Sequence, residues 1–359
     1  MSDSLEYLLG ELVDIATKSE SYETIDRTRI ESLCLELKEK TPVGTRFESK
    51  TGLIEKLIDM PFKNETTGSF KTIIENFVYF TKDLKIKDIG KFVDKSPVVF
   101  GLNIEENIKL KVEYFKEIGV KDIGKFVSMA PNVFSHSIED NMRPKVEYIK
   151  EIGVKDIGKF VSKSPNVFNL SIEDNMKPKV EYLRKIGVKD VGKFASRYPS
   201  VFGLSIEDKM KPIAEYLKKI GVGDIGKFVS LLPAVFGQSI EENMKPKVRY
   251  LKEIGVKDIG KFVSRCPAVL SLSIEDNMKP KVEFYKSKGY TIRNIENFPQ
   301  GFSYSLEKRI EPRFAYLKHI GKHNVGLNNI LILGDSAFSK RFGGHEQAYS
   351  NFLEEYKKK

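Results

Sequence analysis

Apolar residues recur at helical spacing along most of the chain, and residues 153–186 show the pattern most clearly. Ile157, Phe160 and Val161 follow an i, i+3, i+4 spacing, which predicts a short helix. Because Pro165 disfavours a helical conformation at Ser164, we expect this helix to end there. After a short turn, a second apolar stripe predicts a second helix, and its members are Ile172, Met176, Val180, Leu183 and Ile186.

Polar residues and a glycine mark the ends of the second helix. Ser171 is a typical N-cap, and the acidic pair at 173–174 lies in the first turn, where the helix dipole favours negative charge. Gly187 stands at the expected C′ position. Pro178 removes a backbone hydrogen bond inside the helix, so we predict a bent second helix wherever this proline occurs. The first unit has Leu110 at this place and should be straighter.

This two-helix pattern repeats every 34 residues. The motif Ile-Gly-Val-Lys-Asp-Ile-Gly-Lys-Phe begins at Ile118 and returns, with single changes, at Ile152, Ile186, Ile220 and Ile254. Two series of prolines keep the same step: Pro97, Pro131, Pro165, Pro199, Pro233 and Pro267, and Pro144, Pro178, Pro212, Pro246 and Pro280. One helix pair cannot bury both apolar stripes, so neighbouring units must stack. We therefore predict an all-α solenoid with a right- or left-handed superhelical course.

The repeats divide the chain into three parts. Residues 1–85 form an N-terminal helical leader, with a degenerate repeat from about residue 52, residues 86–342 hold about seven repeats, and residues 343–359 form a C-terminal tail. Tetratricopeptide repeats have the same length, but they place small residues where their helices cross and close the second helix with proline. Here Phe and Val fill the crossing positions and proline closes the first helix, which argues against that class.

The unit GVKDIGKFVSKSPNVFNLSIEDNMKPKVEYLRKI, at 153–186, resembles the repeat of the mitochondrial transcription termination factor (mTERF) family. The resemblance lies in the Gly-Val opening with its aspartate, the Ser-Pro-x-Val-Phe junction and the Asn-x-x-Pro-Lys-Val-x-Tyr-Leu segment. The closing unit NFPQGFSYSLEKRIEPRFAYL (297–317) and the segment LNNILILGDSAFSKRF (327–342) are similar to the C-terminal part of plant and algal members. The resemblance covers about residues 86–342.

The resemblance implies a superhelix of helix–3₁₀–helix units that binds nucleic acid along a basic inner groove and has no enzymatic activity. It also implies a role in organellar gene expression, such as transcription termination or initiation on double-stranded DNA, or RNA processing. No cofactor and no small-molecule substrate are expected. The units of this chain are unusually alike, so we expect little sequence discrimination.

The charge distribution agrees with a polyanionic partner. The chain has 60 Lys+Arg and 50 Asp+Glu, a net charge of +10, and residues 1–85 carry −4, so the remainder carries +14. Such a basic body favours nucleic acid, although lysines also keep long surfaces soluble.

One lysine position recurs in six successive units, on the side of the first helix opposite its apolar stripe: Lys91, Lys125, Lys159, Lys193, Lys227 and Lys261. Lys163, Arg197 and Arg265 extend this row one turn further. Stacked units would align these cations, and a row of cations suits a sugar–phosphate backbone through counterion release. The alternative is a solvated helix face that is merely repeated.

Further cations lie in the second helices. Lys308, Arg309 and Arg313 of the last unit form the strongest single candidate for phosphate contact, because arginine makes forked hydrogen bonds. Arg143, Lys145, Lys177, Lys179 and their repeats flank the helix prolines, and phosphate contact and solubility explain them equally well. The tyrosine repeated at Tyr114, Tyr148, Tyr182, Tyr216 and Tyr250 fits packing between repeats better than base stacking.

The sequence carries no sign of catalysis, and we expect no catalytic and no metal-binding residues. His136, His319, His323 and His345 are scattered, and the sequence has no phosphate-binding loop of the G-x-x-x-x-G-K-[ST] type. Cys34 and Cys266 are too far apart in the sequence to suggest a disulfide framework or a zinc site. No apolar stretch approaches the roughly 18 residues that a membrane helix needs.

The N-terminal residues do not look like a transit peptide, because Asp3, Glu6, Glu11, Asp14 and Glu20 contradict an acid-poor composition. A faint similarity of residues 8–42 to plastid lipid-associated proteins favours a chloroplast over a mitochondrion.

Two interpretations of function remain open. The first is a nucleic-acid-binding solenoid, expected as a monomer, that acts on double-stranded DNA or RNA in an organelle. The second is a protein-binding scaffold whose lysines serve solubility. The choice between DNA and RNA, the target sequence and the step of gene expression are left open by the residues.

Overall fold

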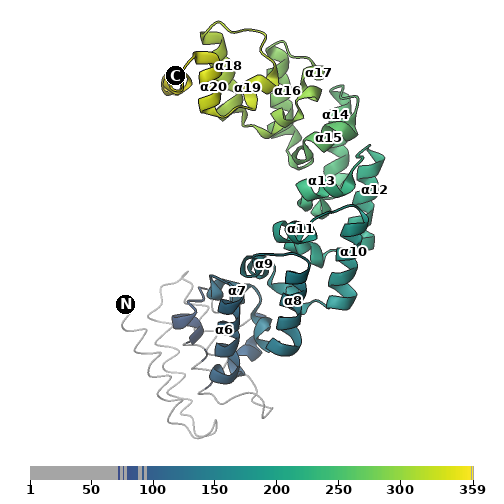
Figure 1. Ribbon diagram of the computed structural model, residues 1–359, viewed down its shortest axis with the longest axis vertical. Helices are drawn as coiled ribbons and strands as arrows, with labels where there is room; N and C mark the ends of the chain where they lie inside the picture. The colour runs from purple at the N-terminus through teal and green to yellow at the C-terminus, as the bar shows by residue number, and fades with distance from the viewer. Residues whose placement is uncertain are drawn as a thin grey trace, which may run out of the picture. The chain divides into compact units, whose positions relative to one another are not determined.

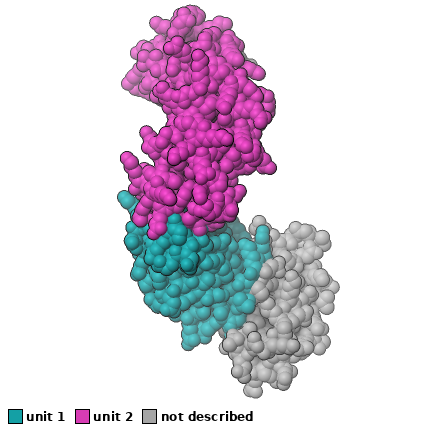
Figure 2. All heavy atoms as spheres, turned by 90° about the vertical axis from the view of Figure 1, so that its right-hand side faces the viewer, with its two compact units in different colours: residues 1–178, 195–202 teal, residues 179–194, 203–359 magenta. Residues whose placement is uncertain are grey.

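The structure is a computed structural model of the 359-residue chain, and it describes residues 72, 76, 79–87, 91–92, 95–356 and 358. The predicted leader helix and most of the degenerate repeat from about residue 52 therefore lie outside the described residues. The chain divides into two compact units, Met1–Pro178 with Ala195–Phe202, and Lys179–Phe194 with Gly203–Lys359, which we call unit 1 and unit 2 (Figure 2).

The described residues form helices and contain no strand, as the all-α prediction requires. Each repeat has a first α-helix, a 3₁₀ turn, a π-helical turn and a second α-helix (Figure 1). In unit 2, the first helices α13 and α15 form one layer, and the second helices α12 and α14 form the other.

The first helices are α7 (Ile123–Met129), α9 (Ile157–Lys163), α11 (Val191–Arg197), α13 (Ile225–Leu231), α15 (Ile259–Arg265) and α17 (Ile292–Asn297). The 3₁₀ turns that follow each first helix are η3 (Pro97–Gly101), η5 (Pro131–Ser135), η7 (Pro165–Asn169), η9 (Pro199–Gly203), η11 (Pro233–Gly237), η13 (Pro267–Ser271) and η15 (Pro299–Ser303). The second helices are α6 (Leu110–Glu117), α8 (Arg143–Glu151), α10 (Lys177–Lys185), α12 (Lys211–Lys219), α14 (Lys245–Glu253), α16 (Lys279–Ser287) and α18 (Glu311–His319).

Sequence and structure agree on the ends of the helices. Helix α9 ends at Lys163, one residue before the position that Pro165 constrains. The Ser171 hydroxyl accepts the Asp174 N–H at 3.1 Å and donates to the Asp174 carboxylate at 2.9 Å, so Ser171 is the predicted N-cap. Gly187 has a φ of 94°, the left-handed conformation that closes a helix and that glycine adopts without strain.

The proline of the second helix lies directly after a widened turn. The π turns that precede second helices are η4 (Ile104–Lys109), η6 (Ile138–Met142), η8 (Ile172–Met176), η10 (Ile206–Met210), η12 (Ile240–Met244), η14 (Ile274–Met278) and η16 (Leu306–Ile310), and η2 (Tyr79–Asp83) is a further π turn outside this series. In η8, the Met176 N–H donates to the Ser171 carbonyl, five residues back, at 3.1 Å. Pro178 is then the second residue of α10, where its missing N–H is tolerated.

The first unit does not differ from the others as we expected. Leu110 replaces the proline there, yet η4 has the same widened turn, with the Ile108 N–H donating to the Asn103 carbonyl at 3.2 Å. The proline therefore fits a turn that forms without it.

Apolar contacts between consecutive repeats build the core. The phenylalanine of a first helix packs edge-on against the phenylalanine in the 3₁₀ turn of the following repeat. Ring centroids are 6.2 Å apart for Phe160 and Phe202 in unit 1, and 6.0 Å apart for Phe262 and Phe302 in unit 2. All four rings are buried.

Two glycines per repeat allow neighbouring repeats to approach closely. A Cβ placed on Gly158 of α9 would lie 1.9 Å from the carbonyl oxygen of Gly119, which lies between α6 and α7 at the start of the preceding repeat. Gly260 has the same relation to Gly221 in unit 2, at 2.0 Å. The glycine of the repeated Ile-Gly-Lys motif is therefore a packing position.

Three further helices follow the last repeat: α19 (Leu327–Leu331), α20 (Asp335–Gly343) and α21 (Ala348–Tyr356). The predicted C-terminal tail thus contains α21, which packs on α20 and α18. Tyr316, Phe338 and Tyr349 form the apolar centre of this contact, with Phe338 and Tyr349 centroids 4.9 Å apart.

Candidate nucleic-acid interface

The repeated central lysine is the third residue of the first helices α7, α9, α11, α13 and α15, whereas α17 has Asn294 at this place. In α9, the Asp156 carboxylate accepts the backbone N–H of Lys159 at 2.9 Å and thereby caps the helix. Ile157, Phe160 and Val161 are buried, so the Lys159 side chain lies on the solvent side. Equivalent caps at 2.8–2.9 Å hold Lys125, Lys193, Lys227 and Lys261.

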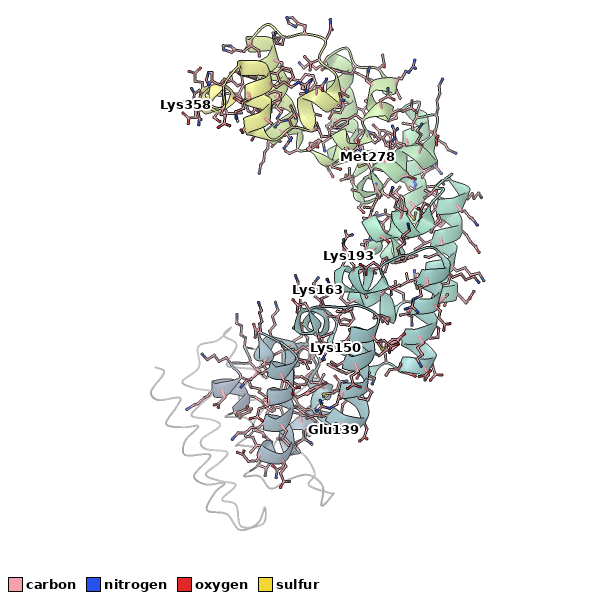
Figure 3. The ribbon with its side chains drawn as sticks, viewed as in Figure 1. Glu139, Lys150, Lys163, Lys193, Met278 and Lys358 are labelled. Carbon is pink, nitrogen blue, oxygen red and sulfur yellow. The ribbon has the colours of Figure 1, made fainter. Side chains whose placement is uncertain are left out.

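Every cation of the predicted first-helix row is exposed. Its members are Lys91, Lys125, Lys159, Lys163, Lys193, Arg197, Lys227, Lys261 and Arg265. Figure 3 shows the side chains of Lys163 and Lys193 leaving the ribbon from first helices of unit 1 and unit 2, respectively. Within the described residues, the side chains of Lys125, Lys159, Lys193, Lys227 and Lys261 form no ion pair.

In unit 1, several of these lysines share one groove. Between α7 and α9 lies a hollow of about 510 Å³, and its lining includes Lys121, Lys125, Lys159 and Lys163. Asp122 and Asp156 also line it, but each carboxylate accepts a backbone N–H at its helix start. The groove therefore presents four ammonium groups from two consecutive repeats to a ligand.

Some flanking cations also connect neighbouring repeats. The Lys163 ammonium donates to the Ser196 carbonyl at 3.3 Å, and the Lys95 ammonium donates to the Ser128 carbonyl at 2.9 Å. Both lysines remain exposed, so a single hydrogen bond to the next first helix orients them along the row.

The comparison with known protein families decides the assignment. The mTERF family model matches residues 70–339, three quarters of the chain. The chain belongs to the mTERF family. No curated protein matches it. The mTERF family is a non-enzymatic family of helical repeats that binds nucleic acids and functions in organellar gene expression. The all-α repeat fold and the family resemblance drawn from the sequence are thus confirmed.

Two absences hold for the described part of this mTERF protein. None of its helices has both the length and the apolar character needed to cross a membrane. No three His, Cys, Asp or Glu side chains gather there in a way that could hold a metal ion.

The cluster of Lys308, Arg309 and Arg313 requires a correction. Lys308 is exposed, but Arg313 is fully buried, and its guanidinium donates to the Ile330 carbonyl at 2.6 Å and to the Asp335 carboxylate at 2.5 Å. The Arg309 guanidinium donates to the Leu331 and Leu333 carbonyls at 2.6–3.1 Å. These two arginines hold the C-terminal segment, so they are not available to phosphate.

The lysine that follows the helix proline in four repeats, and follows Leu110 in the first, has a role that the sequence did not reveal. Lys111, Lys145, Lys179, Lys247 and Lys281 are each less than 10% exposed. The Lys281 ammonium donates to the Asn277 side chain at 2.8 Å and to the Phe302 carbonyl of the next 3₁₀ turn at 2.7 Å. We call these five residues the seam lysines. The asparagine four residues before each of them is the signal that could have identified them.

Burial changes the acidity of the seam lysines. It lowers the pKa of Lys111 and of Lys281 to about 8, because the charged form loses hydration. The pKa values of Lys145, Lys179 and Lys247 are lowered for the same reason. These groups stabilise contacts between repeats and are not part of the interface.

The residue before the helix proline is neutralised locally. Arg143, Lys177, Lys211, Lys245 and Lys279 each pair with the glutamate four residues earlier, as in the 2.9 Å contact of Arg143 Nε with Glu139. Exposed pairs of this kind add little stability, but they offset the positive charge of the residue before the proline. Among the described cations directly beside the helix proline, none is therefore both exposed and unpaired, in contrast to the central lysines of α7, α9, α11, α13 and α15.

Burial of the repeated tyrosines favours packing between repeats over base stacking. Tyr114, Tyr148 and Tyr250 are less than 10% exposed. Burial raises the pKa of Tyr114 and of Tyr250 to about 12, which is expected of a phenol that has lost hydration.

Proposed function

We propose that this mTERF protein binds the sugar–phosphate backbone of double-stranded DNA or RNA through its first-helix row, and that it thereby regulates transcription or RNA processing in an organelle. The proposed contacts are Lys91, Lys125, Lys159, Lys163, Lys193, Arg197, Lys227, Lys261 and Arg265, with Lys308 at the last repeat. The chloroplast is the favoured compartment, and a monomer is the proposed active form.

One observation carries the proposal: the central lysines Lys125, Lys159, Lys193, Lys227 and Lys261 are exposed and form no ion pair with a described residue, whereas the second-helix cations beside the proline are buried or paired. Solubility would not distinguish between these positions. Phosphate binding distinguishes between them. An ammonium group that is already paired with a carboxylate must lose that partner before it can displace a counterion from the nucleic acid.

The backbone contact is expected to be largely independent of sequence. Ammonium groups on flexible side chains contact phosphates, which are the same at every step of the strand. Discrimination between bases needs groups that reach base edges. The near identity of the repeats places the same side chain at each step of the row.

Crosslinking tests where nucleic acid lies. The full chain is irradiated with a photoreactive DNA duplex and, separately, an RNA hairpin, and the crosslinked peptides are identified by mass spectrometry. We expect crosslinks to the peptides of α7, α9, α11, α13 and α15. The nucleic acid that gives the higher crosslinking yield identifies the target class. Crosslinks confined to the second helices would contradict the proposal.

The protein-scaffold interpretation predicts a different result. A pull-down from organelle extract after nuclease treatment would then retain one partner protein at constant stoichiometry. Loss of all partners after nuclease treatment, together with first-helix crosslinks, supports nucleic-acid binding.

A further inference from the structure

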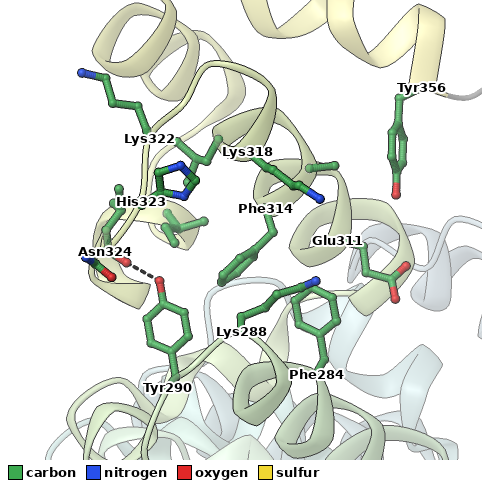
Figure 4. A pocket seen from close by; sticks show the side chains of 14 residues that line it. Phe284, Lys288, Tyr290, Glu311, Phe314, Lys318, Lys322, His323, Asn324 and Tyr356 are labelled. Atoms are coloured by element: carbon green, nitrogen blue, oxygen red, sulfur yellow. Dashed lines mark hydrogen bonds between the residues drawn. The ribbon is translucent and has the colours of Figure 1, made fainter.

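The second-helix layer of unit 2 contains a pocket that the nucleic-acid interface does not use. Its volume is about 660 Å³, within the range of small-molecule sites. The C-terminal end of α16, helix α18, the segment 322–325 and Tyr356 of α21 surround it (Figure 4). The first-helix row lies on the other layer, so this site is independent of the proposed function.

The pocket arises where the last repeat departs from the others. Lys288 occupies the position of Ile118, Ile152, Ile186, Ile220 and Ile254 at the end of the second helix. Phe314 replaces a residue that is Val in five of the six preceding repeats, and Ala315 replaces a residue that is Glu in five of them. These changes add an aromatic ring and a cation and remove a carboxylate.

Half-buried aromatic rings form the floor. The Phe284 and Phe314 rings lie 5.2 Å apart at 87°, and the Phe314 and Tyr290 rings lie 5.6 Å apart at 85°. The Tyr290 hydroxyl donates to the Val325 carbonyl and fixes the segment 322–325 beside the rings. Each of the three rings keeps part of its surface open to solvent, which offers stacking area to a flat ligand.

Cations form the rim. Lys288, Lys318, Lys322 and His323 line the pocket and are exposed, and Glu311 is the one carboxylate among the lining residues. The Lys288 ammonium lies 5.1 Å from the centre of the Phe284 ring. None of the three lysines forms an ion pair with any residue that the structure describes. In Figure 4, the ends of Lys288 and Lys318 lie on the same side of Phe314, the side on which Glu311 lies.

We propose that this pocket binds a nucleoside phosphate, with the base against Phe284 and Phe314 and the phosphate groups at Lys288, Lys318 and Lys322. A flat aromatic group joined to several negative charges matches an aromatic floor with a cationic rim. The ligand is either a free nucleotide or the phosphorylated end of a nucleic-acid strand.

Calorimetric titration of the full chain with ATP tests the site, with adenosine and pyrophosphate as partial probes. We expect saturable binding of ATP that is at least about tenfold tighter than that of either partial probe, since base and phosphates each contribute. Pyrophosphate binding as tightly as ATP would overturn the role of the rings. Absence of ATP binding would overturn the free-nucleotide form.

A 5′-phosphorylated single-stranded octamer separates the two sources of the ligand. If the octamer binds through this pocket and ATP does not, the ligand is a strand end. If neither probe depends on the rim lysines, the proposal fails.

The variants assign binding to the pocket. K288E/K318E should weaken ATP or octamer binding by at least about tenfold, because two charge contacts become repulsive. K252E/K286E is the matched control, since both lysines are exposed, lie outside the pocket lining and the proposed nucleic-acid contacts, and give the same charge change. Equal weakening by both pairs would overturn the proposal. Phe314→Val restores the residue of the regular repeats and should reduce the advantage of ATP over pyrophosphate while the protein stays folded.

Discussion

Lysine side chains serve three purposes in each repeat, and the position in the repeat decides which. On the first helix, Lys159 is exposed and without an ion pair. On the second helix, Lys177 pairs with Glu173 at 2.5 Å, and a lysine such as Lys145 is buried and donates to the Phe168 carbonyl at 2.6 Å. Composition alone cannot separate these roles, because they depend on which side chain of the next repeat lies opposite.

The glycine of the first helix gives the first prediction. Gly158→Ala should lower the free energy of unfolding by about 3 kcal/mol or more, the upper range for an overpacked contact. Alanine favours a helix by only about 1 kcal/mol, and its Cβ would meet the Gly119 carbonyl oxygen at 1.9 Å. Urea denaturation measures the change.

Gly223→Ala is the matched control, because an added Cβ at Gly223 meets no atom within 4 Å. It should change the free energy of unfolding by less than about 0.5 kcal/mol. Similar effects of the two substitutions would show that the close approach between repeats does not depend on Gly158.

The seam lysines give a second prediction, on pH. Burial lowers the pKa of Lys281 to about 8, below the value of about 10.4 in an unfolded chain, so the folded state binds fewer protons between these values. The contribution of Lys281 to the free energy of unfolding should therefore rise as pH increases from about 8 to 10.

Lys281→Met removes this titration and keeps most of the side-chain volume. Urea denaturation at pH 8 and pH 10 should show a smaller rise for Lys281→Met than for the unsubstituted protein. Lys286→Met, exposed on the same helix, should behave like the unsubstituted protein. An identical pH dependence in all three would contradict the burial of a charged Lys281.

At the scale of helices and turns, local signals account for most of what the sequence predicted. The Ser171 cap, the break before Pro165 and the left-handed Gly187 depend on neighbouring residues, so the pattern along the chain reveals them. The π turn was missed because Pro178 suggested a bend, while the same turn forms with Leu110.

The C-terminal helices show how contacts distant in the sequence escaped prediction. Arg313 occupies the repeat position of Lys281, and both donate to a carbonyl of the following element, Ile330 or Phe302. Sequence spacing identified Arg313 as a cation but could not show that α19 covers it. The segment after the last repeat thus takes the place of a next repeat.

This equivalence yields a third prediction. Arg313→Ala should lower the free energy of unfolding by about 3 kcal/mol, because it leaves a cavity and removes the donor to the Ile330 carbonyl, while the exposed Asp335 carboxylate is hydrated. Hydrogen exchange should show loss of protection in α19 and α20. Arg313→Lys keeps a donor for the Ile330 carbonyl and should lose less. Lys308→Ala, at an exposed position, should leave protection unchanged. Undiminished protection of α19 and α20 in Arg313→Ala would contradict the conclusion that Arg313 holds the C-terminal segment in place.

At the scale of the whole molecule, repetition turns a weak local signal into a surface. One exposed lysine is uninformative, but the same lysine at Lys125, Lys159, Lys193, Lys227 and Lys261 offers regularly placed charges. The sequence predicted this exposure from the helix period alone. It could not predict that the lysines after the helix proline would be buried, because that outcome depends on contacts with the next repeat.

The fourth prediction tests the central claim most directly, by comparing salt dependence in two charge-reversed variants. K159E/K193E/K261E reverses the first-helix row, and K150E/K218E/K252E reverses one exposed position of the second helices with the same change in net charge. Affinity for a DNA duplex and an RNA duplex is measured from low to high salt. The row variant should bind more weakly, and the slope of log affinity against log salt should fall in magnitude by about 3 for DNA, one unit for each lost phosphate contact. The control variant should keep the slope of the unsubstituted protein. Equal slopes for all three proteins would contradict the claim that the first-helix row binds the backbone.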